Sequence, residues 1–121
     1  MDPREKAFFC IQCALDKKAL DPVLLDLQGV SPLADYFIIC SGTSVRHIQA
    51  IAQHIEVSFK SHGDYALGIE GSREGKWVLL DYDDVIIHLF QEHERTFYDL
   101  ENLWSECSRI PIPEDPPNVP A

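Results

Sequence analysis

The chain has 121 residues and a mass of 13.8 kDa, which suffices for one hydrophobic core but not for two. Hydrophobic residues make up 45% and charged residues 25%, and these proportions exclude disorder over most of the length. The 20 acidic and 10 basic residues give a formal net charge of −10, with the basic residues scattered, so a basic protein partner fits better than direct nucleic-acid binding.

The N-terminal half predicts a helix, two strands and a second helix. Apolar residues at three- and four-residue spacing over residues 4–20 are typical of an amphipathic helix. Short apolar runs at 23–27 and 36–40 predict two buried strands. Residues 45–62 form the most strongly predicted helix, because only a helix places their apolar residues on one face: Ile48, Ile51, Ala52, Ile55 and Phe59.

The C-terminal half predicts three strands and a final helix. The strands cover residues 65–70, 77–82 and 85–90, with Asp83-Asp84 forming a tight hairpin between the last two. The helix covers about 94–106, with one apolar face that is made by Phe97, Leu100 and Leu103 or Trp104.

This order of elements predicts an α/β (α+β) fold: a small mixed sheet of about five strands, partly parallel and partly antiparallel, covered by helices. The folded domain is expected over residues 1–108. Five of the twelve residues after Arg109 are proline, so residues 109–121 predict an extended or disordered tail.

The N-terminus has no signal-peptide pattern, and no apolar stretch is long enough for a membrane-spanning helix. We therefore expect a cytoplasmic protein without membrane contact. Cys10 and Cys13 have the spacing of a redox or zinc motif, but no second pair accompanies them. We therefore expect them, with Cys40 and Cys107, to be reduced and mostly packed thiols.

The segment Gly42-Thr43-Ser44 leaves a predicted strand and opens a predicted helix, where exposed amides can hold phosphate. Nucleotidyl transfer also needs two metal-binding carboxylates in the pattern acid, apolar, acid about ten residues later. That place holds His54-Ile55-Glu56, which lacks the first acid, whereas Asp81-Tyr82-Asp83 lies far downstream at a turn. Helix capping is the favoured interpretation, and a nucleotide-binding or nucleotidyl-transferring enzyme is the alternative function.

Two of the predicted strands carry further candidate site residues. His88 interrupts an apolar strand, which favours a hydrogen-bonded, partly buried histidine over a metal ligand. In the preceding strand, Trp77, Leu79 and Asp81 share one side of the sheet. Aromatic residues beside acids are typical of a contact with a basic protein, although Trp77 as a core residue is the alternative.

The sequence resembles the ribosomal silencing factor (RsfS or Iojap) family over about residues 6–105, where its matching segments occur in the same order as in the family. These segments are Asp26-Leu27, Gly29-Val30-Ser31, Ala34 to Ser44, His47 to Ala52, Glu70-Gly71, Trp77 to Tyr82, Asp84 to Phe90, Arg95 and Tyr98 to Trp104.

The resemblance implies a fold similar to the nucleotidyltransferase fold without its catalytic acids, and a protein that is no enzyme and uses no cofactor or metal. It implies a translation repressor that binds the large ribosomal subunit through its basic fourteenth protein (L-fourteen) at the intersubunit face. The repressor thereby blocks joining of the small subunit when nutrients are short, and organellar relatives act in large-subunit assembly. The free protein is expected to be a homodimer.

The family's tryptophan strand and acidic turn match one stretch of this chain, which the resemblance implies to be the contact surface: Trp77, Leu79, Leu80, Asp81 and Tyr82. One position departs from the family, because Asp83 stands where glycine is usual. The turn is therefore open to a different backbone conformation, although Asp tolerates the left-handed region better than most residues.

Overall fold

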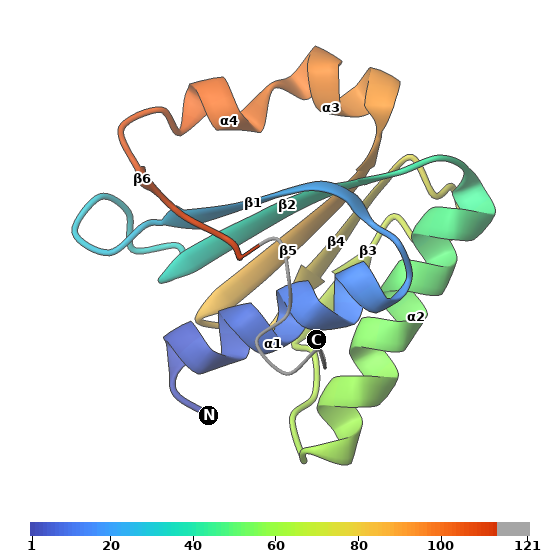
Figure 1. Cartoon of the computed structure of the whole chain (residues 1–121), viewed down its shortest axis with the longest axis horizontal. Coiled ribbons are helices and arrows are strands. Elements are labelled where there is room, and N and C mark those ends of the chain that lie inside the picture. Colours follow the sequence, from blue (N-terminus) through green and yellow to red (C-terminus); the bar gives the residue numbers. More distant parts are fainter. Residues whose placement is uncertain (114–121) are drawn as a thin grey trace.

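The computed structural model describes residues 1–113 and has one mixed sheet of six strands in the order β3-β4-β5-β2-β1-β6. Helices α1 and α2 cover one face of the sheet, and α3 and α4 lie on the other (Figure 1). The mixed α/β class predicted from the sequence is confirmed. The elements are α1 (Pro3–Asp16), β1 (Leu20–Asp26), β2 (Tyr36–Gly42), α2 (Val45–Ser61), β3 (Gly68–Glu70), β4 (Trp77–Asp81), β5 (Val85–Gln91), α3 (Glu92–Tyr98), α4 (Leu100–Leu103) and β6 (Ser108–Ile110).

The main core lies between the sheet and the pair α1 and α2. The predicted apolar stripe of α2 is buried in full, from Ile48 to Phe59. Both α1 and α2 begin at a side-chain cap: Asp2 accepts from the Glu5 amide at 2.8 Å, and Ser44 accepts from the His47 amide at 3.1 Å. The capping role expected near Gly42-Thr43-Ser44 is therefore confirmed.

The centre of the sheet is the parallel pair β2 and β5, and every other pairing is antiparallel. Between β4 and β5 the predicted tight hairpin is present, with the Tyr82 amide donating to the Val85 carbonyl at 3.0 Å. Asp83 has a φ of 74°, so this aspartate adopts the left-handed backbone that glycine adopts most easily. The Asp81 carboxylate accepts from the Asp83 amide at 2.8 Å and stabilises the turn.

The single helix expected over 94–106 is wrong, because Asp99 interrupts it with a φ of 46°. Arg95 donates to Ser41 of β2 at 2.8 Å and to Glu101 at 3.0 Å. Residues six apart lie about 120° apart around a regular helix, so the break brings Glu101 round to Arg95. The predicted apolar face also changes, because Leu100 and Trp104 pack on the sheet while the other two are exposed: Phe97 at 73% and Leu103 at 70%.

The sheet has six strands rather than the expected five, because β6 pairs antiparallel with the segment Leu24 to Asp26 of β1. A strand of three residues is too short to show the alternation that predicts strands. It also runs past position 109, where the tail was expected to begin. Residues 114–121, the rest of that tail, lie outside the described residues, and the boundary at 108 stays a prediction.

Candidate functional site

Strand β4 presents alternate residues to the two faces of the sheet. Val78 and Leu80 point into the main core and are fully buried, whereas Trp77, Leu79 and Asp81 are half-buried on the opposite face. The predicted contact surface therefore needs a correction. Leu80 is 0% exposed and Tyr82, packed against Phe59 under the hairpin, is 1% exposed, so neither has surface to offer a partner.

The Trp77 indole is held by three contacts. It stacks on Phe90 with ring centroids 4.9 Å apart, and Tyr98 of α3 lies against it at 4.6 Å. Its Nε1–H donates to Nδ1 of His88 at 3.2 Å. The half-buried ring packs on the sheet and keeps one portion at the surface, so Trp77 is not a fully buried core residue, and its role as a partner contact stays a prediction.

His88 is hydrogen-bonded as the sequence predicted, but it is buried more deeply, with 4% of its surface exposed. Burial lowers its pKa to about 4, so the ring is neutral at physiological pH. Since the indole nitrogen can only donate, Nδ1 of His88 is the acceptor and Nε2 carries the proton. Phe37 closes the other side of the ring in an edge contact at 4.8 Å.

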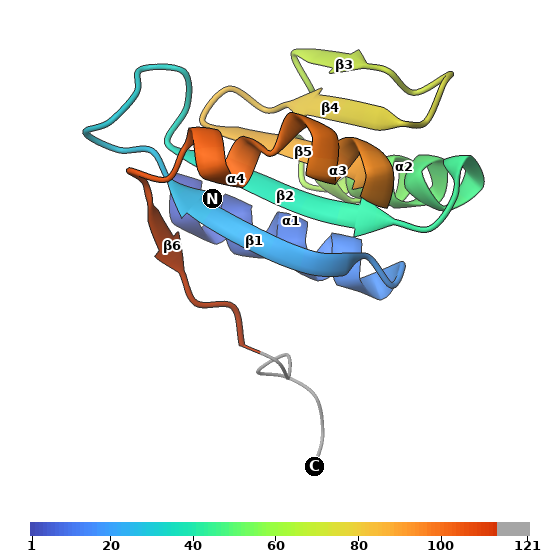
Figure 2. The same ribbon diagram turned by 90° about the horizontal axis from the view of Figure 1, so that it is seen from above.

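We use the name β4 face for the surface formed by Trp77, Leu79 and Asp81 of β4 with Ile86 of β5. Figure 2 shows that α3 and α4 run above β5 and β2 and leave β3 and β4 uncovered. All four residues of the β4 face are consequently half-buried rather than covered. The β4 face is an apolar surface with an aromatic residue at one end and a carboxylate at the other.

Ile86 of the β4 face and Tyr98 beside it are not among the contact residues predicted from the sequence. Ile86 was recoverable, because a two-residue turn at Asp83-Asp84 places it opposite Asp81 in an antiparallel hairpin. Tyr98 reaches Trp77 only through the path of α3, and the local sequence carries no signal for that packing.

Acidic side chains border the β4 face. Glu70 pairs with Leu79 across β3 and β4 and is exposed, while Asp81 belongs to the face itself. Asp83 is exposed in the adjoining hairpin. Lys76, next to Trp77, is an exposed basic neighbour. The border nevertheless has more negative than positive charge, which favours a positively charged partner.

The turn between β3 and β4 places Trp77 by close backbone packing. Gly71 has a φ of 82°, and a Cβ built there would lie 2.0 Å from the carbonyl oxygen of Trp77. Gly75, with a φ of 65°, packs against Val45 so closely that a Cβ would lie 2.6 Å from its Cγ1. The Gly75 carbonyl accepts a hydrogen bond from the side-chain amide of Gln91 at 2.9 Å. Only glycine fits these two positions without displacing their neighbours.

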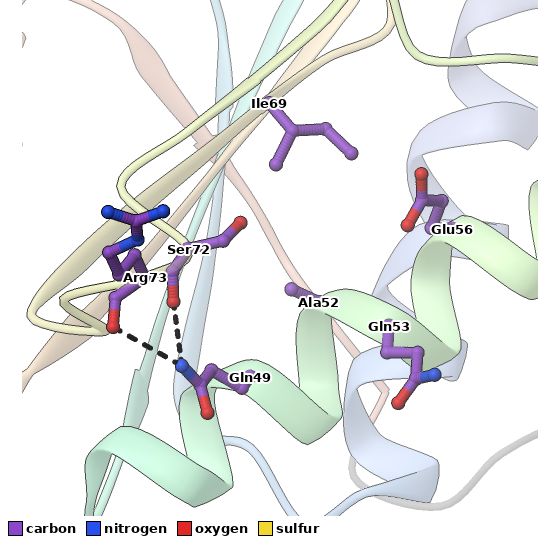
Figure 3. A pocket seen from close by; sticks show the side chains of 7 residues that line it. All are labelled: Gln49, Ala52, Gln53, Glu56, Ile69, Ser72 and Arg73. Carbon is purple, nitrogen blue, oxygen red and sulfur yellow. Dashed lines mark hydrogen bonds between the residues drawn. The ribbon is translucent and has the colours of Figure 1, made fainter.

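A pocket of about 380 Å³ lies between α2 and this turn (Figure 3), on the face of the sheet that α2 covers, and the β4 face lies on the opposite one. Gln49 donates from its side-chain amide to the carbonyls of Ser72 at 2.8 Å and Arg73 at 3.4 Å. These bonds tie the turn to α2, so the polar groups at this end of the pocket serve the fold. The lining residues are Gln49, Ala52, Gln53, Glu56, Ile69, Ser72 and Arg73.

The geometry argues against the nucleotidyl-transfer alternative. Gly42 pairs with Gln91 at one end of β5, whereas Asp81 pairs with Ile86 five residues earlier, which is about 16 Å along the strand. The Thr43 amide already donates to Nδ1 of His47 at 2.9 Å. The glycine turn and the acidic pair therefore lie at opposite ends of the sheet and cannot hold one nucleotide and its metal.

Outside the β4 face, the described residues offer no reactive cysteine and no metal-binding group. All four cysteines are buried, as expected, and burial raises the pKa of Cys40 to about 12, which keeps its thiol protonated. Within residues 1–113, histidine, cysteine and acidic side chains form no group of three or more that could hold a metal ion. In the same part of the chain, no helix is long and apolar enough to cross a membrane.

Comparison with known proteins identifies relatives over the whole fold. The family model described as "Ribosomal silencing factor during starvation" matches residues 1–121. The chain is 44% identical to the ribosomal silencing factor RsfS of Bacillus subtilis over 92 residues, covering 76% of this chain and 78% of that protein. A mouse protein named mitochondrial assembly of ribosomal large subunit protein 1 is 36% identical over 92 residues, which cover 74% of this chain and 40% of its own length.

Solved structures agree. A crystal structure of a Chromobacterium violaceum protein superposes with a TM-score of 0.85 at 30% identity and covers 98% of this chain and 97% of the other. A second, from Bacillus halodurans, gives a TM-score of 0.81 at 34% identity over 90% of this chain and 99% of the other. Sequence, family model and fold agree over nearly the whole length, and the chain belongs to the ribosomal silencing factor (RsfS) family.

Proposed function

We propose that this protein is a translation repressor that binds the large ribosomal subunit and blocks joining of the small subunit when nutrients are short. Its target is the basic fourteenth large-subunit protein (L-fourteen) at the intersubunit face, and the contact is made by the β4 face. The observation that carries the proposal is the half-buried Trp77, which is stacked, hydrogen-bonded and set in a part of the sheet that the helices leave open.

Packing supports the β4 face as a protein contact. A tryptophan packed against both Phe90 and Tyr98 loses little conformational freedom on binding, because its neighbours already restrict it. Leu79 and Ile86 supply apolar area beside it. Aromatic anchors of this kind commonly contribute 2 kcal/mol or more, on the order of the hot spots found by alanine substitution.

Charge supports a basic protein as the partner. Residues 81–106 contain eight acidic residues against Arg95 alone, and the net charge of the whole chain is −10. Acidic groups such as Asp81 and Glu70 raise the association rate with a positively charged protein and repel bare phosphate backbones. The chain therefore reaches the ribosome through a protein and makes no direct contact with nucleic acid.

Further parts of the proposal concern the state of the protein in the cell. It acts in the cytoplasm, forms a homodimer when free, needs no cofactor or metal and catalyses no reaction. Binding to the large subunit also gives this protein a role in large-subunit assembly, a role that the name of the mouse relative states for that protein.

Sedimentation with separated ribosomal subunits of the source organism tests the proposal. The wild-type chain is expected to migrate with the large subunit, and Leu79→Arg is expected to lose this binding, because it puts a positive charge on the half-exposed β4 face. Val57→Arg is the matched control, since Val57 is 57% exposed on α2, across the sheet. Migration with the small subunit alone, or equal loss for both variants, would contradict the proposal.

A further inference from the structure

We propose that His88 is a positioning residue, whose Nδ1 selects the orientation in which Trp77 presents its indole ring on the β4 face. The consequence for binding rests on the function proposed above, whereas the orientation itself is a property of the free protein. His88 lies beneath the β4 face, across the strand pair from Leu79. It has no surface for a partner, so its effect on binding must pass through Trp77.

Stacking alone does not determine which way the indole points. Phe90 and Tyr98 contact the Trp77 ring at 4.9 and 4.6 Å and restrict its plane. The torsion that turns an aromatic ring about its bond to Cβ has broad, roughly two-fold minima, so the same plane accommodates two orientations of an indole. Only one orientation points Nε1–H at Nδ1 of His88, at the observed 3.2 Å. The hydrogen bond therefore chooses between two otherwise similar packings.

The chemistry of this bond requires a neutral histidine with its proton on Nε2. Burial lowers the pKa of His88 and keeps the ring neutral, and Phe37, Trp77 and Phe90 surround it without adding a charge. The protonated Nε2 is buried and finds no acceptor among residues 1–113. A buried donor without a partner lowers stability, and phenylalanine would avoid this loss. Packing alone thus favours phenylalanine at position 88, whereas the Trp77 bond requires a nitrogen or oxygen acceptor.

Two variants separate positioning from packing. His88→Phe keeps an aromatic ring and removes the acceptor, and we expect a free energy of unfolding at pH 7 equal to or above that of wild type. His88→Asn places an amide oxygen near the position of Nδ1 but removes most of the ring. We expect this variant to be less stable and to keep the orientation of Trp77.

Nuclear magnetic resonance on the free protein tests the hydrogen bond on which this orientation depends. The wild-type ¹⁵N spectrum is expected to show His88 with an unprotonated Nδ1. The indole N–H of Trp77 is expected to exchange with solvent at least tenfold more slowly in wild type and His88→Asn than in His88→Phe. A proton on Nδ1 in wild type, or equal indole exchange in wild type and His88→Phe, would overturn the inference. The protonation of Nδ1 is measured on the wild-type protein, so this result does not depend on whether a variant folds.

Binding to purified large ribosomal subunits measures the consequence. His88→Phe is expected to bind at least fivefold more weakly than wild type despite its stability, and the less stable His88→Asn is expected to stay within twofold of wild type. A merely structural role predicts the reverse order, with affinity following stability.

Trp77→Ala separates failure of this inference from failure of the proposed function. If it loses binding while His88→Phe binds like wild type, positioning is refuted and the β4 face stands. If Trp77→Ala itself binds like wild type, the proposed contact is refuted, and the indole exchange rates still decide whether His88 holds the indole N–H.

Discussion

Acid should destabilise this protein through His88. Burial lowers its pKa from the ordinary 6.5 to about 4 in the folded state, so between these values the unfolded chain binds more protons than the folded one. The free energy of unfolding therefore falls as pH drops through this window. A difference of about 2.5 pKa units corresponds to roughly 3 kcal/mol, fully lost below pH 4 and fully present above pH 6.5.

Urea denaturation of wild type and His88→Phe at half-unit steps from pH 4 to 7.5 isolates this effect. Other titrating groups, including the ion pairs of Lys6, are common to both proteins and cancel in the difference. We expect wild type to lose about 3 kcal/mol relative to the variant between pH 7.5 and 4. A difference that stays constant with pH would refute the reasoning, because it would mean that His88 titrates alike in the folded and unfolded states.

Three further substitutions test other parts of the structure. Gly71→Ala should lower the free energy of unfolding by about 2 kcal/mol or more, since it combines a left-handed backbone with a clash at the Trp77 carbonyl; equal chemical denaturation midpoints would show that the turn relaxes freely. Lys6→Met should cost about 2 kcal/mol, because Asp84 and a buried carbonyl lose a charged donor, and a loss below about 0.5 kcal/mol in the same assay would contradict this. Asp81→Lys should weaken binding to the large subunit most at low salt, and a salt-independent loss would argue against charge steering.

The helix α2 was predictable because its apolar residues repeat with the helical period and its ends carry local signals. The cap Ser44 and the apolar stripe from Ile48 to Phe59 both lie within one continuous segment of the sequence. The alternation of β4 also predicted correctly that Trp77, Leu79 and Asp81 share one side of the sheet. In both cases the determining interactions are close along the sequence.

The break at Asp99 could not be predicted in this way. It depends on Arg95 reaching Ser41 and Glu101, and the first of these partners lies 54 positions away. The strand β6 likewise owes its conformation to pairing with β1, more than eighty residues earlier. The local sequence pattern around a residue does not indicate partners that lie so far away along the chain.

Leu80 and Tyr82 of the predicted contact surface are buried for a different reason, while Trp77, Leu79 and Asp81 stay a prediction. The family resemblance implies Leu80 and Tyr82 as part of one continuous block, although neighbouring residues of a strand point to opposite faces of the sheet and cannot all contact one partner. The alternation was already visible in the sequence and would have excluded Leu80. Burial of Tyr82 follows from the hairpin, which folds it over Phe59.

Subunit joining tests the central proposal most directly. Large subunits are incubated with the chain, small subunits are added, and the joined fraction is measured by sedimentation. We predict that wild type and Val57→Arg lower the joined fraction, whereas Leu79→Arg and Trp77→Ala, each shown to be folded, leave it as high as without protein. Undiminished joining with wild type bound to the large subunit, or equal inhibition by all four proteins, would contradict a repressor that acts through the β4 face.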